Sequence, residues 1–168
     1  MKLKMFAAAA LALALGACAG GNDDAASGGS AKSAAGADAG RQVATAPQFK
    51  PGSQEELNAT IGDRVFFDFD KYDLKPEARA TVGSWADWMK RHQNVSVQVE
   101  GHADERGTRE YNLALGARRA NAIRDYLGAL GVTPNRVNTI SYGKERPAVL
   151  GSNNEAWAQN RRGVVVVE

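Results

Sequence analysis

The feature that most constrains this chain is a strand, a polar turn and a long helix that follow one another between residues 95 and 130. Valines at every second position from 95 to 99 alternate with polar residues, which is the pattern of a strand with one buried face. The turn at 101–108 then gathers charged side chains between two glycines, which permit tight turns. This order predicts a charged loop between the end of a strand and the start of a helix.

The phase of the helix predicts which of its side chains reach the loop. Thr108 is the expected N-cap. Leu115 and Arg119 fall at the border of the apolar stripe, whereas Arg118 falls on the solvated side. The stripe itself comprises Leu113, Gly116, Ala120, Ile123, Leu127 and Leu130. A border arginine near the carboxylate of Asp104 can form a small site with charges of both signs, which suits a zwitterionic ligand.

Strands and helices alternate along the rest of the chain. The predicted helices cover residues 54–61, 76–91, 109–130 and 154–161, and the predicted strands cover 64–69, 95–100, 137–142 and 163–167. Pro76 suits the first position of its helix, and Gly131 suits the end of the long one. We therefore expect an α/β sandwich, with one mixed sheet of about four strands and helices packed on one face.

The N-terminus has the pattern of an export signal. Residues 1–17 contain two early lysines and then an apolar run, and they are expected to act as a signal peptide. Cys18 is the only cysteine of the chain, which excludes an intrachain disulfide and a cysteine metal cluster. Residues 18–52 are rich in Gly and Ala and are expected to form a disordered, flexible tether. The folded domain is then expected to cover residues 53–168.

Charge excludes some partners. Of the 21 Lys and Arg side chains, Lys2 and Lys4 precede Cys18, and the rest balance the 19 Asp and Glu side chains. The chain beyond the signal peptide is therefore neutral, and no basic patch indicates nucleic acid binding.

Several motifs together resemble one known family. GHADERGTREYN at 101–112, RRAN at 118–121, SYGKERPAVLG at 141–151 and NRR at 160–162 resemble the OmpA-like peptidoglycan-binding domain. The resemblance covers residues 64–167 and extends to the peptidoglycan-associated lipoproteins within that family. The α/β sandwich of the family agrees with the fold expected above.

The resemblance implies a site and its ligand. Its ligand is the diaminopimelate of the cell-wall stem peptide, whose free end carries an ammonium and a carboxylate on one carbon. The resemblance assigns the ammonium to Asp104, with Asp70 as a second carboxylate, and the carboxylate to Arg119. Phe69, Leu115 and Arg106 are further candidate ligand contacts. For Phe69 and Leu115 the alternative is core packing, and for Asp104 it is capping of the turn.

The resemblance also implies a lipid anchor, a location and partners. The residues before Cys18 resemble a bacterial lipobox, which implies cleavage there and acylation of Cys18, with sorting to the outer membrane. The domain would face the periplasm, bind peptidoglycan noncovalently and dock the propeller protein TolB of the Tol system. The function predicted is thus that of a non-catalytic tether between outer membrane and cell wall.

An enzyme is the alternative from another class. His102 and Asp104 could begin the zinc site of a cell-wall hydrolase, but such a site needs a further ligand, and His92 belongs to another element. No serine stands in a nucleophile-elbow motif and no glycine-rich phosphate loop is present. We therefore expect neither a metal nor another cofactor, and we expect His102 to be a hydrogen-bonded residue of the turn.

Overall fold

The computed structural model describes residues 48–168. The predicted signal peptide, the predicted lipid attachment at Cys18 and the tether up to residue 47 lie outside the described residues. The helices within residues 48–168 are α1 (Gln54–Thr60), α2 (Pro76–Arg91), α3 (Arg109–Ala129), the 3₁₀ helix η1 (Pro134–Arg136) and α4 (Asn154–Asn160). The strands are β1 (Arg64–Phe66), β2 (Val97–His102), β3 (Val137–Gly143) and β4 (Arg162–Val167).

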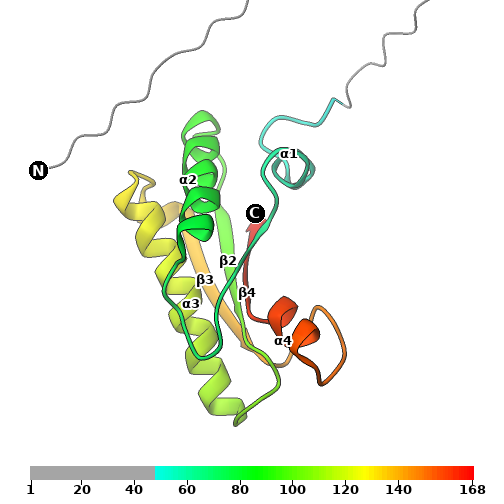
Figure 1. Cartoon of the computed structure of the whole chain (residues 1–168). Helices are drawn as coiled ribbons and strands as arrows, with labels where there is room; N and C mark the ends of the chain where they lie inside the picture. The colour runs from blue at the N-terminus through cyan, green and yellow to red at the C-terminus, as the bar shows by residue number, and fades with distance from the viewer. Residues whose placement is uncertain (1–47) are drawn as a thin grey trace, which may run out of the picture. The chain divides into compact units, whose positions relative to one another are not determined.

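The four strands form one mixed sheet in the order β1-β4-β2-β3 (Figure 1). β4 is antiparallel to both of its neighbours, and β2 and β3 are parallel. α2 and α3 lie side by side over one face of the sheet, and α3 contacts β2, β3 and β4. The predicted α/β sandwich with its helices packed on one face is confirmed.

Local sequence signals fix where the helices begin. Ser53, Thr108 and Asn153 each place a side-chain oxygen on a free backbone N–H of the following first turn. Pro76 occupies the first position of α2, where its missing N–H is not needed. α3 ends at Ala129, and Gly131 follows it with φ of +93°. The N–H groups of Gly131 and Val132 donate to carbonyls of the last turn of the helix and so close it.

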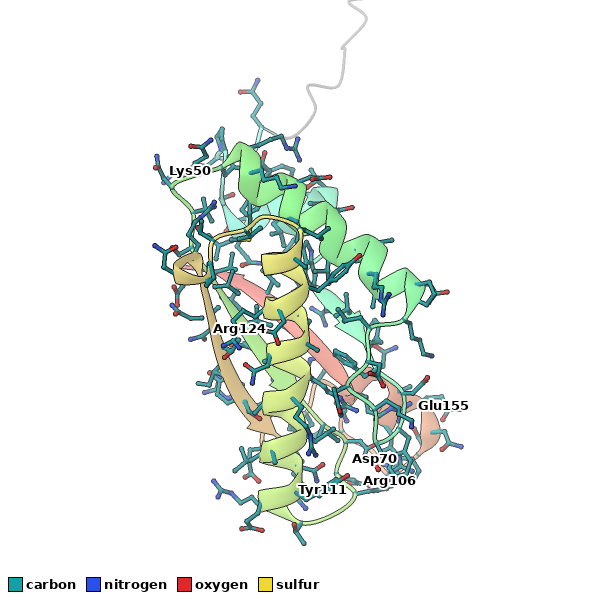
Figure 2. All side chains as sticks on the ribbon, turned by 90° about the vertical axis from the view of Figure 1, so that its left-hand side faces the viewer. Lys50, Asp70, Arg106, Tyr111, Arg124 and Glu155 are labelled. Carbon is teal, nitrogen blue, oxygen red and sulfur yellow. The ribbon has the colours of Figure 1, made fainter. Side chains whose placement is uncertain are left out.

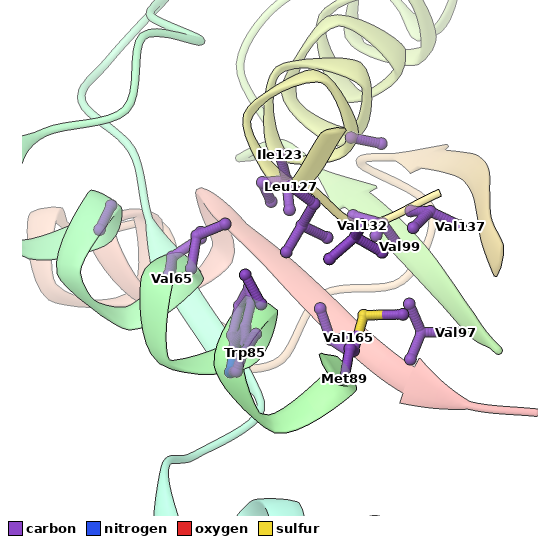
Figure 3. Close-up of a cluster of buried hydrophobic side chains, with 14 of the residues drawn as sticks. Val65, Trp85, Met89, Val97, Val99, Ile123, Leu127, Val132, Val137 and Val165 are labelled. Carbon is purple, nitrogen blue, oxygen red and sulfur yellow. The ribbon is translucent and has the colours of Figure 1, made fainter. Parts of the chain in front are cut away.

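The core fills the space between the sheet and the two long helices (Figure 3). Trp85 and Met89 of α2 and Ile123 and Leu127 of α3 are buried against the valines of β2 and β4. The predicted stripe of α3 is largely confirmed, since Gly116, Ala120, Ile123 and Leu127 are buried, whereas Leu113 and Leu130 at its two ends are only half-buried.

β2 and α3 touch through backbone at one point. A Cβ atom on Gly101 would lie 1.9 Å from the carbonyl oxygen of Gly116, and one on Gly116 would lie 2.3 Å from Ser141 Oγ. Both positions therefore require glycine because there is no space for a side chain, and not because of an unusual backbone φ angle. This contact holds the N-terminal half of α3 tight against the end of β2, where the charged loop begins.

The first strand is shorter than predicted, which matters for the site. We expected it to run over 64–69, but β1 ends at Phe66. The Phe67 N–H then donates to the carbonyl of Arg161, and the chain turns out of the sheet. β2 begins and ends two residues later than predicted, at Val97 and His102. No helix within residues 48–168 is long and apolar enough to cross a membrane.

Candidate functional site

A cavity of about 270 Å³ opens between the loop after β1, the loop after β2 and the first turns of α3. It contains all six residues that the sequence analysis singled out, although they come from separate parts of the chain. The residues that line it are Phe69, Asp70, Asp104, Arg106, Gly107, Tyr111, Asn112, Leu115 and Arg119. Figure 2 shows Asp70, Arg106 and Tyr111 close together at the N-terminal end of α3.

The loop after β1 delivers two of these residues. Asp70 adopts φ of +57°, the left-handed region that Asp tolerates better than most residues. Its carboxylate accepts a hydrogen bond from the Tyr111 hydroxyl, and this bond raises the pKa of Tyr111. At this turn the Phe69 residue is 57% exposed. The alternative of core packing for Phe69 is therefore wrong.

Asp104 is buried and surrounded by donors. Its Oδ1 accepts from the backbone N–H and Nε of Arg106 at 3.1 and 3.2 Å. Its Oδ2 accepts from Arg106 Nη2 at 2.6 Å and from Arg161 Nη1 at 3.4 Å. Burial alone would raise the pKa of the Asp104 carboxyl, but the hydrogen bonds from Arg106 outweigh it and hold this pKa below its ordinary value. Asp104 is thus a carboxylate at neutral pH.

Arg106 is clamped between two aromatic rings. Its Cζ lies 4.0 Å from the centre of the Phe69 ring and 4.1 Å from the centre of the Trp157 ring. Trp157 also donates its indole N–H to Glu105 at 3.0 Å. Trp157 is not among the site residues predicted from the sequence. Its spacing could have indicated it, since Trp157 precedes Asn160 by three residues and Arg161 by four, which puts these side chains on one face of α4.

Arg119 is deeper than predicted. We expected it at the border of the apolar stripe, but its exposed fraction is 0%. Its guanidinium donates to the carbonyls of Lys71 at 2.8 Å, His102 at 2.6 Å and Asp68 at 3.0 Å. The loop after β1 folds over Arg119 and supplies two of these acceptors, which is why the helix phase alone misplaced it. Burial, and then the charge of Arg161, lowers the pKa of Arg119 to about 10, so it stays charged at neutral pH.

The donors of Arg119 are not exhausted. A guanidinium has five N–H groups, and three are engaged, which leaves one on each terminal nitrogen. Leu115, one turn earlier on α3, is 5% exposed and lines the same cavity. The cavity therefore combines an apolar wall at Leu115 with a buried cation behind it.

The NRR motif braces the site. Arg161 donates from Nε to the Phe67 carbonyl at 3.0 Å and forms the ion pair to Asp104 described above, so it joins the loop after β1 to the loop after β2. Asn160 accepts from the backbone N–H groups of Ala148 and Val149 and donates to the Val149 carbonyl. Its amide thereby holds the loop that precedes α4.

His102 differs from its predicted role. The ring is buried, and neither nitrogen has a hydrogen-bond partner, although Glu100 Oε2 lies 3.4 Å from Nε2. Burial, and then the positive charge of Arg162, lowers the pKa of His102 to about 4. Within residues 48–168, no three His, Cys, Asp or Glu side chains are grouped so that they could hold a metal ion. The geometry around His102 therefore does not favour the zinc hydrolase.

Comparison with known proteins gives relatives for this fold and sequence. The model of the OmpA family matches residues 66–161. The peptidoglycan-associated lipoprotein of Rhizobium meliloti is 53% identical over 117 residues, which are 70% of this chain and 66% of that protein, slightly under two thirds of its length. That of Brucella melitensis is 50% identical over 117 residues, 70% of each protein.

A solved structure agrees with both relatives. The peptidoglycan-associated lipoprotein from Burkholderia pseudomallei superposes with a TM-score of 0.62 at 42% identity, over 63% of this chain and 90% of that one. The chain belongs to the OmpA family. Its relatives carry the names of lipoproteins associated with peptidoglycan and not of enzymes, in agreement with the predicted absence of catalysis.

Proposed function

We propose that this protein is a lipoprotein of the outer membrane that binds peptidoglycan noncovalently through the diaminopimelate of the stem peptide. Membership of the OmpA family and the names of its relatives support peptidoglycan as the partner. The observation that carries the choice of ligand is the Asp104–Arg106 ion pair at 2.6 Å on the wall of the cavity.

A zwitterion can insert into that ion pair without leaving a charge unpaired. The four hydrogen bonds to Asp104 use its acceptor positions, so a ligand ammonium reaches Asp104 only if Arg106 gives up part of its contact. The ligand carboxylate then replaces Asp104 as the partner of Arg106. A ligand without the ammonium would take Arg106 from Asp104 and leave this buried carboxylate with only the 3.4 Å ion pair to Arg161. A ligand without the carboxylate would leave Arg106 without a carboxylate partner.

The remaining cavity residues complete the proposed binding mode. Asp70 lies at the mouth and offers a second carboxylate to the ammonium, as the resemblance implied. Arg119 either donates its two remaining N–H groups to the ligand carboxylate or attracts it electrostatically from its buried position in the cavity wall. Leu115 and the exposed ring of Phe69 provide apolar surface for the aliphatic chain of diaminopimelate.

The anchor and the Tol partners extend this proposal. Acylation of Cys18, a long tether and a wall-binding domain together suit a protein that ties the outer membrane to the cell wall from the periplasmic side. The names of the relatives do not mention the Tol system. The partnership with TolB therefore stays a prediction from the resemblance, without contact residues.

Sedimentation with purified peptidoglycan tests the proposal. We expect the purified chain to sediment with peptidoglycan, and we expect Asp104→Ala and Arg119→Ala each to lose at least about ten-fold in affinity. Asp104→Ala leaves Arg106 and Arg161 without their carboxylate, and Arg119→Ala removes the buried cation and leaves three backbone carbonyls without their donor. Lys90→Ala, at the far end of α2 from the cavity, is the control and should bind normally. Circular dichroism of each variant shows whether the fold is kept. A folded wild type that stays in solution contradicts the proposal.

The same samples test the hydrolase alternative. We expect the peptidoglycan to be recovered intact after incubation. Release of soluble fragments that a chelator prevents would instead favour a zinc enzyme that uses His102.

A further inference from the structure

Beside Tyr111, which lines the cavity, α3 carries a cation that the binding mode above does not use. Arg118 is exposed on α3, and its Cζ lies 5.7 Å from the centre of the Tyr72 ring and 6.0 Å from that of Tyr111. Within the part of the chain that the structure describes, no carboxylate forms an ion pair with Arg118. Arg124 on the same helix is different, because it pairs with Asp125 at 3.2 Å.

The two tyrosines connect Arg118 to the cavity and to a second groove. Tyr111 precedes Arg118 by two helical turns, lines the cavity and donates its hydroxyl hydrogen to Asp70. Tyr72 follows Asp70 by two residues and lines a separate groove of about 340 Å³ that runs along α3 past Ala122. Arg118 thus lies beside one tyrosine that lines the cavity and one that lines the groove.

The arrangement suits a planar anion. Aromatic rings beside a guanidinium restrict its motion and leave its N–H edge free, and this edge matches the two oxygens of a carboxylate. Arg118 is exposed and both tyrosines are 45% exposed, so a ligand can reach the cation. A lysine at this position would supply charge but not the flat, two-pronged donor.

The charges of the cavity itself are already balanced. Two carboxylates, Asp70 and Asp104, face two cations, Arg106 and Arg119, and a zwitterion adds one charge of each sign. A stem peptide carries further carboxylates next to diaminopimelate. One is the α-carboxylate of the preceding glutamyl residue, which is linked through its side chain, and another is the carboxylate at the C-terminus. Such a group needs a cation outside the cavity.

We propose that Arg118, Tyr72 and Tyr111 form a second anion subsite, which binds a carboxylate of a residue adjoining diaminopimelate in the same stem peptide. This inference rests on the proposed function. It gives the site a preference among stem peptides that share diaminopimelate but differ in amidation of their neighbouring carboxylates.

Calorimetry with three synthetic stem peptides tests the subsite. One peptide is unmodified, one has the glutamyl α-carboxylate converted to an amide, and one has the C-terminal carboxylate converted to an amide. We expect the full chain to bind the unmodified peptide about three-fold to ten-fold more tightly than one of the two amides, which identifies the source of the carboxylate. Arg118→Gln should abolish this preference and still bind all three peptides.

Two further readouts separate recognition from general electrostatics. Arg124→Gln, which removes one positive charge from the same helix, should keep the preference. Higher salt should reduce the preference, because the subsite is exposed. Equal affinity of the wild type for all three peptides overturns the subsite, and so does a preference that persists in Arg118→Gln. Failure of the wild type to bind any of the peptides overturns the proposed function as well.

Discussion

The cavity contains two arginines, and their different burial gives them different roles. Arg119 is fully buried and fixed by three backbone carbonyls, so it is a permanent part of the wall. The side chain of Arg106 is 34% exposed and is held by rings and by one carboxylate, which a ligand can replace. A ligand carboxylate can therefore replace Asp104 only at Arg106. The two rings hold the guanidinium of Arg106 in the position in which it can bind that carboxylate.

Removal of one ring tests this view of Arg106. Trp157→Ala should weaken binding of the stem peptide by about three-fold to ten-fold, because Arg106 loses one of its two stacking partners. Calorimetry of wild type and variant gives the ratio. Trp157→Phe, which keeps a ring but not the hydrogen bond to Glu105, should recover most of the affinity. Equal loss in both variants would assign the effect to the hydrogen bond instead.

The burial of His102 predicts that the free energy of unfolding depends on pH. Its pKa is about 4 in the folded protein and near 6.5 when exposed, so the unfolded chain binds a proton first as pH falls. The contribution of His102 is therefore complete above about pH 6.5 and is lost as pH falls towards 4. We expect the free energy of unfolding to drop by up to about 3 kcal/mol from this residue.

Urea unfolding between pH 7 and pH 4 measures this dependence. In His102→Gln the slope over this interval should be smaller than in the wild type, whatever the effect of the variant at pH 7. Parallel curves for the two proteins would show that His102 does not titrate as its burial requires.

At the scale of elements, two glycines of α3 allow the effect of packing on stability to be measured apart from the effect of helix propensity. Gly116 meets backbone and Ser141 within 3 Å of an added Cβ, whereas Gly128 of the same helix has open space there. Gly116→Ala should therefore lower the free energy of unfolding by about 2 kcal/mol or more. Gly128→Ala should raise it by about 0.5–1 kcal/mol, because alanine favours the helix. Urea unfolding of both variants gives the two signs, and stabilisation by Gly116→Ala would contradict the close contact of β2 and α3.

The elements themselves were largely predictable, because caps and periodicity agree. Ser53, Pro76 and Thr108 mark helix starts that the structure confirms. β1 could not be bounded from its apolar run alone, because Phe67 and Phe69 continue the pattern after the ladder has ended. Phe67 is buried and Phe69 is not, and only the turn at Asp70 distinguishes them.

The site residues that belong to recognisable sequence motifs were predictable. All six candidate residues line one cavity, although periodicity alone did not name their ligand, which came from the resemblance. The burial of Arg119 was not predictable, because two of its three acceptors are carbonyls of a loop that lies 48 and 51 residues away in sequence. Trp157 was missed for a similar reason, since its partner Arg106 is far away along the chain.

At the scale of the molecule, the proposal requires that the domain remain attached to a membrane. We expect the mature protein to begin at Cys18 and to carry at least two acyl chains, since one chain binds membranes only weakly. Mass spectrometry of the protein from the membrane fraction gives the number of chains. Cys18→Ser should shift the protein to the soluble periplasmic fraction without loss of peptidoglycan binding. A variant that remains in the membrane would show that the anchor lies elsewhere.

The central claim is that the cavity recognises both charges on the free end of diaminopimelate. The most direct measurement is calorimetry of the purified chain with two stem peptides, one with the free amine of diaminopimelate and one with that amine acetylated. We predict saturable binding of the free form, with the acetylated form at least about ten-fold weaker, because it offers no ammonium to replace Arg106 at Asp104 and leaves this buried carboxylate with Arg161 alone. Equal affinities for the two peptides would contradict the account.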